Sequence, residues 1–347
     1  MSHSAPAQDI GRLEFDPAQF ARSNPGHVAF YLYPNFSMLA YASAIEGLRL
    51  ANRIAGRRLY DWTTISTEGA SVKASNGVPI QPDSSAAETR ITPGRDAPFD
   101  YAFICGGSGT EHVHDNIAES WLRVQALQNS SIGALCTGAH ALARAGLLDE
   151  HKCVIHWESL PGFQESFPEI QVSSDLYEID GDRMSCGGGT AALDLILHLI
   201  QEEHGDALAR AVSELALVDR IRHPHDQQRL SLQDRLGIQN PKIIKVIERM
   251  EANLAEPLPL EKLAYTVDLS RRQLERLFAS HVGRTPARYY LELRLQNARN
   301  LLFQSELSIL DIALASGFVS ASHFSKTYKQ MYGRAPRQER ETEAVGQ

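Results

Sequence analysis

The sequence lacks the features that mark membrane-spanning, secreted and zinc-stabilised chains. No apolar run approaches the roughly eighteen residues needed to cross a bilayer. The first 25 residues have neither the basic start nor the apolar core of a secretory signal, so we expect a mobile arm and a cytoplasmic location. The four cysteines are widely spaced and include no Cys-x-x-Cys pair, which argues against a zinc site and a disulfide framework. We expect free thiols, no metal and no other cofactor.

Length and charge divide the chain into two parts. A chain of 347 residues exceeds one ordinary core, so two domains are expected, and 43% hydrophobic residues suit globular folds. Residues 241–347 carry 16 Lys and Arg against 12 Asp and Glu, whereas residues 1–240 carry 18 against 30. This asymmetry favours a polyanion as the partner of the tail but not of the body.

The tail contains an internal repeat, because a shift of 50 residues lays one part over another. Each copy has an apolar helix, a short turn, a serine that can cap the next helix, and a Gly-Arg-x-Pro stop. Each copy is therefore predicted to be a helix-turn-helix. The matching residues are Leu260, Leu269, Ser270, Leu274, Phe278, Gly283, Arg284 and Pro286 in the first copy and Leu310, Val319, Ser320, Phe324, Tyr328, Gly333, Arg334 and Pro336 in the second.

Local spacing supports the helices of this repeat. The first helix has one apolar stripe, formed by Leu260, Leu263, Ala264 and Val267. Ser270 and Gln273 have the spacing of a capping box, which predicts the start of the next helix. A connecting helix is expected from Pro286 to about Phe303, and about nineteen helical residues span roughly 28 Å. That length is close to the roughly 34 Å between successive major-groove faces, so two recognition helices can reach adjacent turns of DNA.

At these residues the tail resembles the DNA-binding domain of the AraC/XylS family of bacterial transcription regulators, which has two helix-turn-helix units joined by one long helix. The resemblance covers about residues 241–340 and rests on residues 272–278, 283–286, 313–318 and 323–326. It implies base contacts from the exposed start of each recognition helix, namely from Arg271, Arg272, Gln273 and Arg276 in the first and from Ser322, His323 and Lys326 in the second. Arg can bind guanine and Gln can bind adenine through paired hydrogen bonds, whereas a lone Arg or Lys can equally contact phosphate. A helical dimerisation or peptide-binding module is the alternative interpretation.

The body, residues 26–221, alternates short apolar runs with amphipathic helices. This pattern predicts an α/β domain with a doubly wound parallel sheet covered on both faces. The expected strands are residues 27–33, 62–66, 101–105, 132–136 and 152–156, and helices should start near residues 37, 116, 138 and 158, with the last over 190–204. Residues 222–240 are polar and end in Asn-Pro, which predicts a linker to the domain over 241–340. A tail follows at 341–347.

Ligands of such sheets bind beyond the carboxyl ends of the strands. There, Gly106 and Gly107 follow the third expected strand, and Thr137 follows the fourth, which ends in Cys136. A strand-to-helix turn holding Cys136 would place its thiol near the N–H groups of a helix start, as in a nucleophilic elbow. His156 ends the fifth expected strand and could face Cys136 as a base.

These turns resemble the DJ-1/PfpI branch of the class I glutamine amidotransferase-like fold over about residues 27–205. In enzymes of that branch a His often follows the elbow cysteine, and an acidic residue near the first helix approaches the thiol. Here Thr137 follows Cys136, and Ala40 stands at the corresponding helical position, with Glu46 further along. We therefore expect no enzyme activity. A cysteine-dependent hydrolase or hydratase that uses Cys136 and His156 is the alternative.

A DJ-1-like domain followed by an AraC-type tail resembles the arrangement of the GlxA-like regulators, whose former enzyme pocket binds an effector. The chain is also similar to the subgroup that controls catabolism of betaine, carnitine or arginine, through residues 35–37, 43–46, 136–138 and 156–158. The resemblance implies a homodimeric activator that binds promoter DNA, RNA polymerase and a small cationic or zwitterionic amine. The expected effector-binding residues are Asn35, Phe36, Gly106, Gly107, Cys136, Thr137, His156 and Trp157.

Several of these residues also have an interpretation that needs no ligand. Gly106 and Gly107 can simply form a tight turn, and Cys136 can be a small buried residue. His156 can satisfy a hydrogen bond in the core. Trp157 can be core as well, although a Trp face at a pocket mouth suits a quaternary ammonium through cation–π attraction.

A glycine run at residues 187–189 precedes Thr190 and an expected helix. Backbone N–H groups at such a position can bind an anion. The run lacks the Lys of a phosphate loop, so we reject nucleotide binding. A constitutive architectural DNA binder is a third possible function, but it would leave the turns around Cys136 unexplained.

Overall fold

The computed structural model describes residues 24–90 and 99–340. Its contacts divide the chain into two compact units: residues up to 156 together with 170–226, and residues 157–169 together with 227 onward. Residues 1–23 of the predicted arm and the predicted tail at 341–347 lie outside the described residues. Within the described ranges, no helix combines the length and the apolar character needed to cross a bilayer.

The first unit is built on a seven-stranded sheet in the order β10-β11-β7-β6-β1-β2-β5. Neighbouring strands are parallel except for β10 and β11, which are antiparallel. The predicted α/β class with a mainly parallel sheet is confirmed. The strands are β1 (Gly26–Leu32), β2 (Tyr60–Ser66), β5 (Ser84–Ser85), β6 (Tyr101–Cys105), β7 (Ser131–Leu135), β10 (Tyr177–Asp180) and β11 (Arg183–Cys186).

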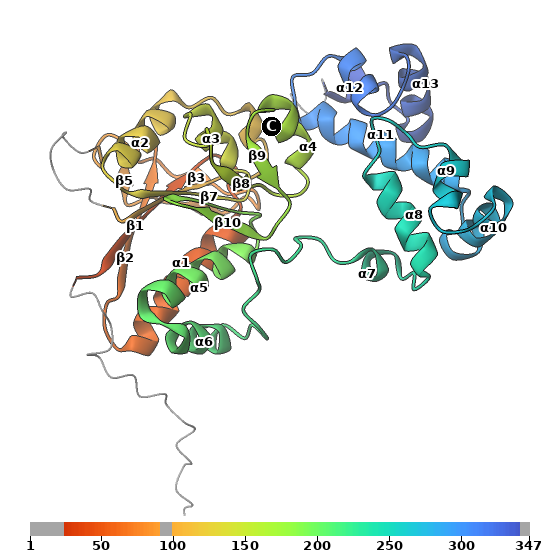
Figure 1. Cartoon of the computed structure of the whole chain (residues 1–347). Coiled ribbons are helices and arrows are strands. Elements are labelled where there is room, and N and C mark those ends of the chain that lie inside the picture. The colour runs from red at the N-terminus through yellow and green to blue at the C-terminus, as the bar shows by residue number, and fades with distance from the viewer. Residues whose placement is uncertain (1–23, 91–98, 341–347) are drawn as a thin grey trace, which may run out of the picture. The chain divides into compact units, whose positions relative to one another are not determined.

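Helices cover both faces of this sheet (Figure 1). One face carries α1 (Met38–Ala55), α5 (Ala191–His204) and α6 (Asp206–Leu215), and the other carries α2 (Asn116–Leu127) and α3 (Ala139–Arg144). Successive side chains of β1 point to opposite faces. Phe30 packs against Tyr41 of α1, and Tyr31 packs against Trp121 of α2. Burial on both faces explains the continuous apolar run of β1.

The strand predicted at residues 152–156 is present over residues 152–154, but its expected place in the main sheet is wrong. β8 (Lys152–Val154) does not join the main sheet but pairs with β9 (Gln171–Ser173) in a separate two-stranded sheet. The position beside β7 is taken by β11. A further two-stranded sheet holds β3 (Val72–Lys73) and β4 (Pro79–Ile80). Strands of two to four residues are too short to show a period in the sequence, which is why these pairings escaped prediction.

The second unit is helical, and the repeat of 50 residues is visible in it. The two recognition helices, α10 (Arg271–Val282) and α13 (Ala321–Tyr332), both have twelve residues. The connecting helix α11 (Pro286–Gln304) has nineteen residues and begins at the predicted proline. The remaining helices are α4 (Leu160–Ser166), α7 (Leu232–Leu236), α8 (Pro241–Glu251), α9 (Leu260–Tyr265) and α12 (Ile309–Ala315).

Both helix-turn-helix cores share α11 (Figure 1). Tyr290, near the start of α11, lies in the cluster formed with α8, α9 and α10. Leu295 and Leu302, further along α11, lie in the cluster formed with α12 and α13. The helix α11 thus sets the distance between the two helix-turn-helix units, because each of them is packed on its own half of that helix.

The turn of the second helix-turn-helix is fixed from two sides. Arg294 of α11 donates hydrogen bonds to the carbonyls of Ser316 (2.8 Å) and Gly317 (2.6 Å). Gly317 has a φ of +75°, and a Cβ there would lie 2.5 Å from the carbonyl oxygen of Leu254, between α8 and α9. Only glycine fits this combination of left-handed backbone and close approach. The second helix-turn-helix therefore contacts the first directly as well as through α11.

Serine caps start both recognition helices, as the repeat predicts. The Ser270 hydroxyl accepts a hydrogen bond from the N–H of Gln273 (3.3 Å), and the Gln273 side chain accepts one from the N–H of Ser270 (2.8 Å). This is the reciprocal capping box. In the second copy the Ser320 hydroxyl accepts from the N–H of His323 (3.3 Å).

Replacing Ser270 by alanine tests the cap of α10. We expect Ser270→Ala to lower the opening free energy of the first turn of α10 by about 1 kcal/mol, because an N–H group loses its acceptor. Hydrogen exchange of the amides of Gln273 and Leu274 in the folded protein measures this opening. Ser270→Asp keeps an acceptor and should retain most of the protection. An equal loss in both variants would contradict the cap.

Candidate effector site and DNA-binding surface

Cys136 occupies the turn between β7 and α3 with a φ of +62°. Non-glycine residues rarely adopt this left-handed conformation, so the surrounding structure has to hold it. The N–H of Cys136 donates to the carbonyl of Cys186 (3.1 Å), and the carbonyl of Cys136 accepts from the N–H of His156 (3.4 Å). The structure thus contains the predicted strand-to-helix turn and brings Cys136 and His156 together.

Gly106 and Gly107 are required by close backbone contacts beside this turn. A Cβ on Gly106 would lie 2.3 Å from the backbone nitrogen of Gly138, and one on Gly107 would lie 1.9 Å from the carbonyl oxygen of Asn35. Any side chain at either position would displace the neighbouring backbone. The tight-turn interpretation therefore accounts for both glycines, whether or not a ligand binds nearby.

Three other residues predicted to bind the effector, Asn35, Phe36 and Thr137, differ in their surroundings. Phe36 is fully buried in the core that includes β1 and α1. The Thr137 hydroxyl donates to the carbonyl of Gly107 (2.7 Å), which ties the two loops together. Asn35 is exposed and has a φ of +57°. In this structure, Asn35 is the residue among the three that presents its side chain to solvent.

The glycine run forms a further side of the Cys136 turn, which the sequence interpretation missed. A Cβ on Gly188 would lie 2.6 Å from Cβ and 2.9 Å from Sγ of Cys136, and Gly188 has a φ of +85°. Leu39 of α1 reaches within 3.9 Å of the Cβ position of Gly189 and is 57% exposed. The sequence did contain a signal for this contact, because the run directly precedes α5, as Thr137 and Gly138 directly precede α3.

The cysteines differ in their surroundings. Burial raises the pKa of the Cys186 thiol to about 11 and that of the Cys153 thiol to about 12, and it also raises the pKa of Cys105. These three thiols therefore stay protonated near neutral pH. Cys136 is the most exposed of the four at 9%. All four are among the described residues, and none forms a disulfide.

In enzymes of the DJ-1/PfpI branch an acidic residue near the first helix approaches the thiol, and α1 supplies no such residue here. Ala40, at the position considered above, is buried. Glu46 is the one acidic residue of α1, and it is exposed and forms an ion pair with Arg49 (2.6 Å). Across residues 24–90 and 99–340, no three His, Cys, Asp or Glu side chains are grouped as metal ligands.

Trp157 belongs to the second unit, and its ring holds a cation of the chain itself. The guanidinium carbon of Arg229 lies 4.2 Å from the ring centroid. The N–H of Trp157 donates to the side-chain oxygen of Gln228 (2.9 Å). In the same unit, α4 packs on α11, where a Cβ on Gly162 would lie 2.8 Å from Cβ of Gln304. The predicted cation–π face of Trp157 is thus used by Arg229.

The predicted DNA-contacting residues are all exposed at the starts of α10 and α13. Arg271 forms ion pairs with Glu261 (2.8 Å) and Glu275 (2.9 Å). Binding a base with Arg271 would require these exposed pairs to break. Exposed pairs contribute little stability, so Arg271 remains available at a small cost.

The other three predicted DNA contacts on α10 differ in whether their side chains already bind another residue. The side-chain oxygen of Gln273 is used in the capping box, so a paired contact with adenine would compete with the cap. Arg272 and Arg276 form no hydrogen bond or ion pair with any described residue. Their guanidinium groups are therefore ready for an external acceptor.

The exposed start of α13 has a different chemistry. Ser322, His323 and Lys326 project there, and the His323 ring packs 5.7 Å from the ring of Phe318. This helix offers a hydroxyl, an imidazole and an ammonium where α10 offers guanidinium groups. Paired contacts with guanine are most readily made by arginine, so the two helices suit different base sequences.

Comparisons with known proteins agree with both halves of this description. Residues 28–202 match the DJ-1/PfpI family, and residues 263–342 match a helix-turn-helix domain. The transcriptional regulator GbdR of Pseudomonas aeruginosa is 46% identical over 93% of this chain and 86% of that protein. The transcriptional regulator CdhR of the same species is 41% identical over 90% of each chain.

A solved structure also matches the chain. The crystal structure of an AraC family transcriptional regulator from Pseudomonas putida covers 55% of this chain and 100% of its own, with a TM-score of 0.50 and 29% identity. Similarity over nearly the whole chain to transcriptional regulators accompanies the two domain matches. The chain therefore belongs to the family of DNA-binding transcriptional regulators in which a DJ-1/PfpI domain precedes an AraC-type helix-turn-helix domain.

Proposed function

We propose that this regulator activates a catabolic operon when a small amine metabolite binds beside the Cys136 turn. The effector is a quaternary ammonium compound such as betaine or carnitine, or a cationic amino acid. The observation that carries this proposal is the Cys136 turn itself. It keeps the geometry of an enzyme elbow, while Thr137 follows the cysteine and Ala40 stands on α1.

Charge supports an amine as the effector. Residues 1–156 and 170–226, which form the first unit, carry 26 Asp and Glu against 16 Lys and Arg, so the field around this unit attracts cations. The bound compound contacts Asn35, His156 and the backbone around Cys136 in this proposal. The ring of Trp157 already holds the guanidinium of Arg229, so a cationic ligand at this ring would have to displace that guanidinium.

The DNA contacts follow from α10, α11 and α13. Arg272 and Arg276 contact guanine bases from α10, and Ser322, His323 and Lys326 contact the next major-groove face from α13. The nineteen residues of α11 suit this spacing, since they span roughly 28 Å. The regulator works in the cytoplasm as a homodimer and recruits RNA polymerase to the promoter.

An arginine substitution tests the base contacts. We expect Arg272→Ala to weaken binding to a site selected from random DNA by about 1 to 3 kcal/mol and to relax the preference at one base pair. Fluorescence anisotropy at one fixed salt concentration measures both effects. Arg58→Ala, which removes an exposed arginine of the first unit, is the control and should leave DNA affinity unchanged. Uniform weakening on all sequences would make Arg272 a phosphate contact instead.

A ligand screen tests the effector class. Betaine, carnitine or arginine at 100 times its dissociation constant should stabilise the first unit by about 2.7 kcal/mol, seen as a higher melting temperature of the purified protein. The control is an analogue of betaine in which carbon replaces the quaternary nitrogen, so that it keeps the carboxylate but lacks the positive charge. It should give a much smaller shift. No shift with any of the three amines would remove this effector class.

Replacing the cysteine separates sensing from catalysis. A sensor with Cys136→Ser should keep effector-dependent promoter binding within about threefold of the unchanged protein, a difference below 1 kcal/mol. The substitution preserves size and leaves the backbone hydrogen bonds of the turn in place. Turnover of an amine or isonitrile by the unchanged protein, abolished in Cys136→Ser, would contradict a pure sensor.

A further inference from the structure

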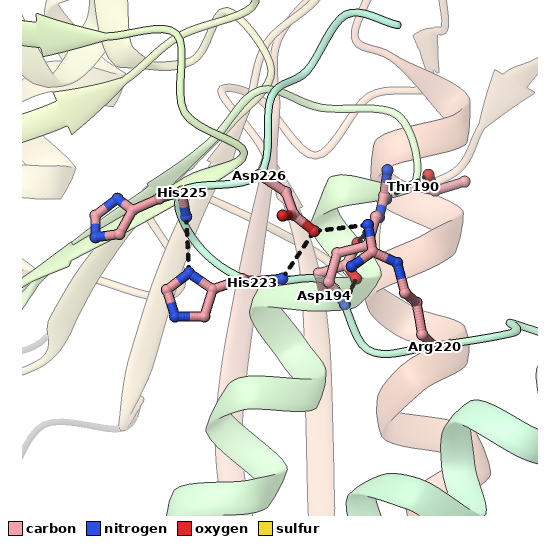
Figure 2. Close-up of polar contacts among 7 residues, drawn as sticks. Thr190, Asp194, Arg220, His223, His225 and Asp226 are labelled. Atoms are coloured by element: carbon pink, nitrogen blue, oxygen red, sulfur yellow. Dashed lines mark hydrogen bonds and ion pairs between the residues drawn. The ribbon is translucent and has the colours of Figure 1, made fainter. Parts of the chain in front are cut away.

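The segment of residues 222–226 is the last part of the first unit before the chain enters the second. Arg222 binds this segment to α5. Its backbone N–H and Nε donate to the carboxylate of Asp194, both at 3.1 Å, and its Nη2 donates to the same carboxylate at 2.6 Å. The same Nη2 donates to Oγ1 of Thr190 (2.7 Å). Figure 2 shows Asp194 of α5, and Thr190 directly before that helix, beside this segment.

The Asp194 carboxylate is buried beside Arg222. Its side chain is 3% exposed, so it depends on Arg222 for compensation of its charge. Removing one partner of a buried ion pair leaves the other charge uncompensated, which is strongly unfavourable. Breaking the contact between Arg222 and Asp194 therefore costs much free energy unless water or another donor replaces the guanidinium.

The rest of the segment is also bound to the first unit. The carbonyl of Pro224 accepts hydrogen bonds from the N–H groups of Leu176 (2.9 Å) and Tyr177 (3.4 Å), at the start of β10. His225 contacts the carboxylate of Asp175 (2.9 Å). Close by, Asp226 accepts from the N–H of His223 and pairs with Arg220, as Figure 2 shows.

One route leads from this segment to the Cys136 turn through α5. Thr190 immediately precedes α5 and follows the glycine run. Within that run Gly188 lies so close to Cys136 that a Cβ would come within 2.9 Å of Sγ. A displacement of the run at Cys136 would act directly on Thr190, which follows the run, and through α5 on Asp194. These two residues are the partners of Arg222.

A second route consists of backbone hydrogen bonds. The N–H of Cys136 donates to the carbonyl of Cys186, and the next residue, Gly187, donates to the carbonyl of Leu176 (2.9 Å). Leu176 in turn donates to the carbonyl of Pro224 (2.9 Å). Two separate chains of contact thus join the Cys136 turn to the same five residues.

We propose that residues 222–226 form a latch that opens when a ligand beside Cys136 displaces the glycine run, and that its opening changes the link to the DNA-binding unit. The proposal rests on the proposed function, in which the effector occupies that turn. Coupling between two sites requires an element with two discrete arrangements that both sites bias. In this proposal the Arg222–Asp194 pair is that element: it is made in the closed latch and broken, with water in place of the guanidinium, in the open one.

The first test perturbs the turn and observes the latch without any ligand. Gly188→Ala forces the new methyl group against Cys136, and we expect hydrogen exchange in the peptide covering residues 218–228 of the full chain to become at least about fivefold faster. Gly181→Ala is the matched control. Gly181 also has a positive φ (+65°), but a Cβ there meets nothing within 4 Å. Equal exchange in the two variants would overturn the proposal.

The second test perturbs the latch and observes the turn, which keeps the proposal testable if Gly188→Ala does not fold. Arg222→Lys retains the charge but loses the fork of donors. Because coupling is reciprocal, the amides of Cys136 and Gly187 should exchange at least about fivefold faster. Arg220→Ala removes an exposed pair of the neighbouring Asp226 and should leave them unchanged. Unchanged exchange in Arg222→Lys would overturn the latch.

A final measurement separates the latch from the effector. Glycine betaine should change promoter affinity of the unchanged protein, and Arg222→Lys should reduce that change at least about fivefold, whereas Arg220→Ala should retain it. A response to betaine that survives in Arg222→Lys would refute the latch. Absence of any response in the unchanged protein would refute betaine as the effector, and the two exchange experiments would still decide the latch.

Discussion

The second unit depends on the burial of α11 on two sides. Each helix-turn-helix is too small to bury its own apolar faces, so each completes its core with half of this helix. Tyr290 serves the first core, and Leu295 and Leu302 serve the second. The same packing that stabilises the units therefore sets the separation of α10 and α13. The helix α11 thus determines both the stability of the two cores and the separation of the two recognition helices.

In the first unit, the constraint is the left-handed turn at Cys136. Such a backbone costs on the order of 1 kcal/mol for a non-glycine residue, and close packing has to maintain it. Gly107 and Gly188 permit the neighbouring loops to approach, and hydrogen bonds from both sides hold the turn. In the proposed function, a ligand that enters this turn has to displace backbone that is packed against Cys136, such as the glycine run at Gly188.

Sequence reasoning recovered what depends on long periodic patterns. The mainly parallel sheet, the repeat of 50 residues and the span of α11 were all predictable, because each leaves a regular signal over many residues. The strand β11 and the pairing of β8 outside the main sheet were not predictable, since three or four residues carry no period and their pairing is decided by tertiary contacts. For the same reason the sequence could not show that Gly188 meets Cys136, or that the face of Trp157 is occupied by Arg229. Those contacts join residues that are distant along the chain or lack any distinctive spacing.

The contact of Gly317 with the carbonyl of Leu254 has a consequence for how information in DNA is used. The two helix-turn-helix units cannot rotate freely about α11, because this contact and the hydrogen bonds of Arg294 bind the second helix-turn-helix to the first. Two independent units could each settle on the best nearby half-site. A rigid pair must instead accept or reject one continuous stretch of promoter in a single register, so a base pair inserted between the halves penalises the whole site, however good each half is.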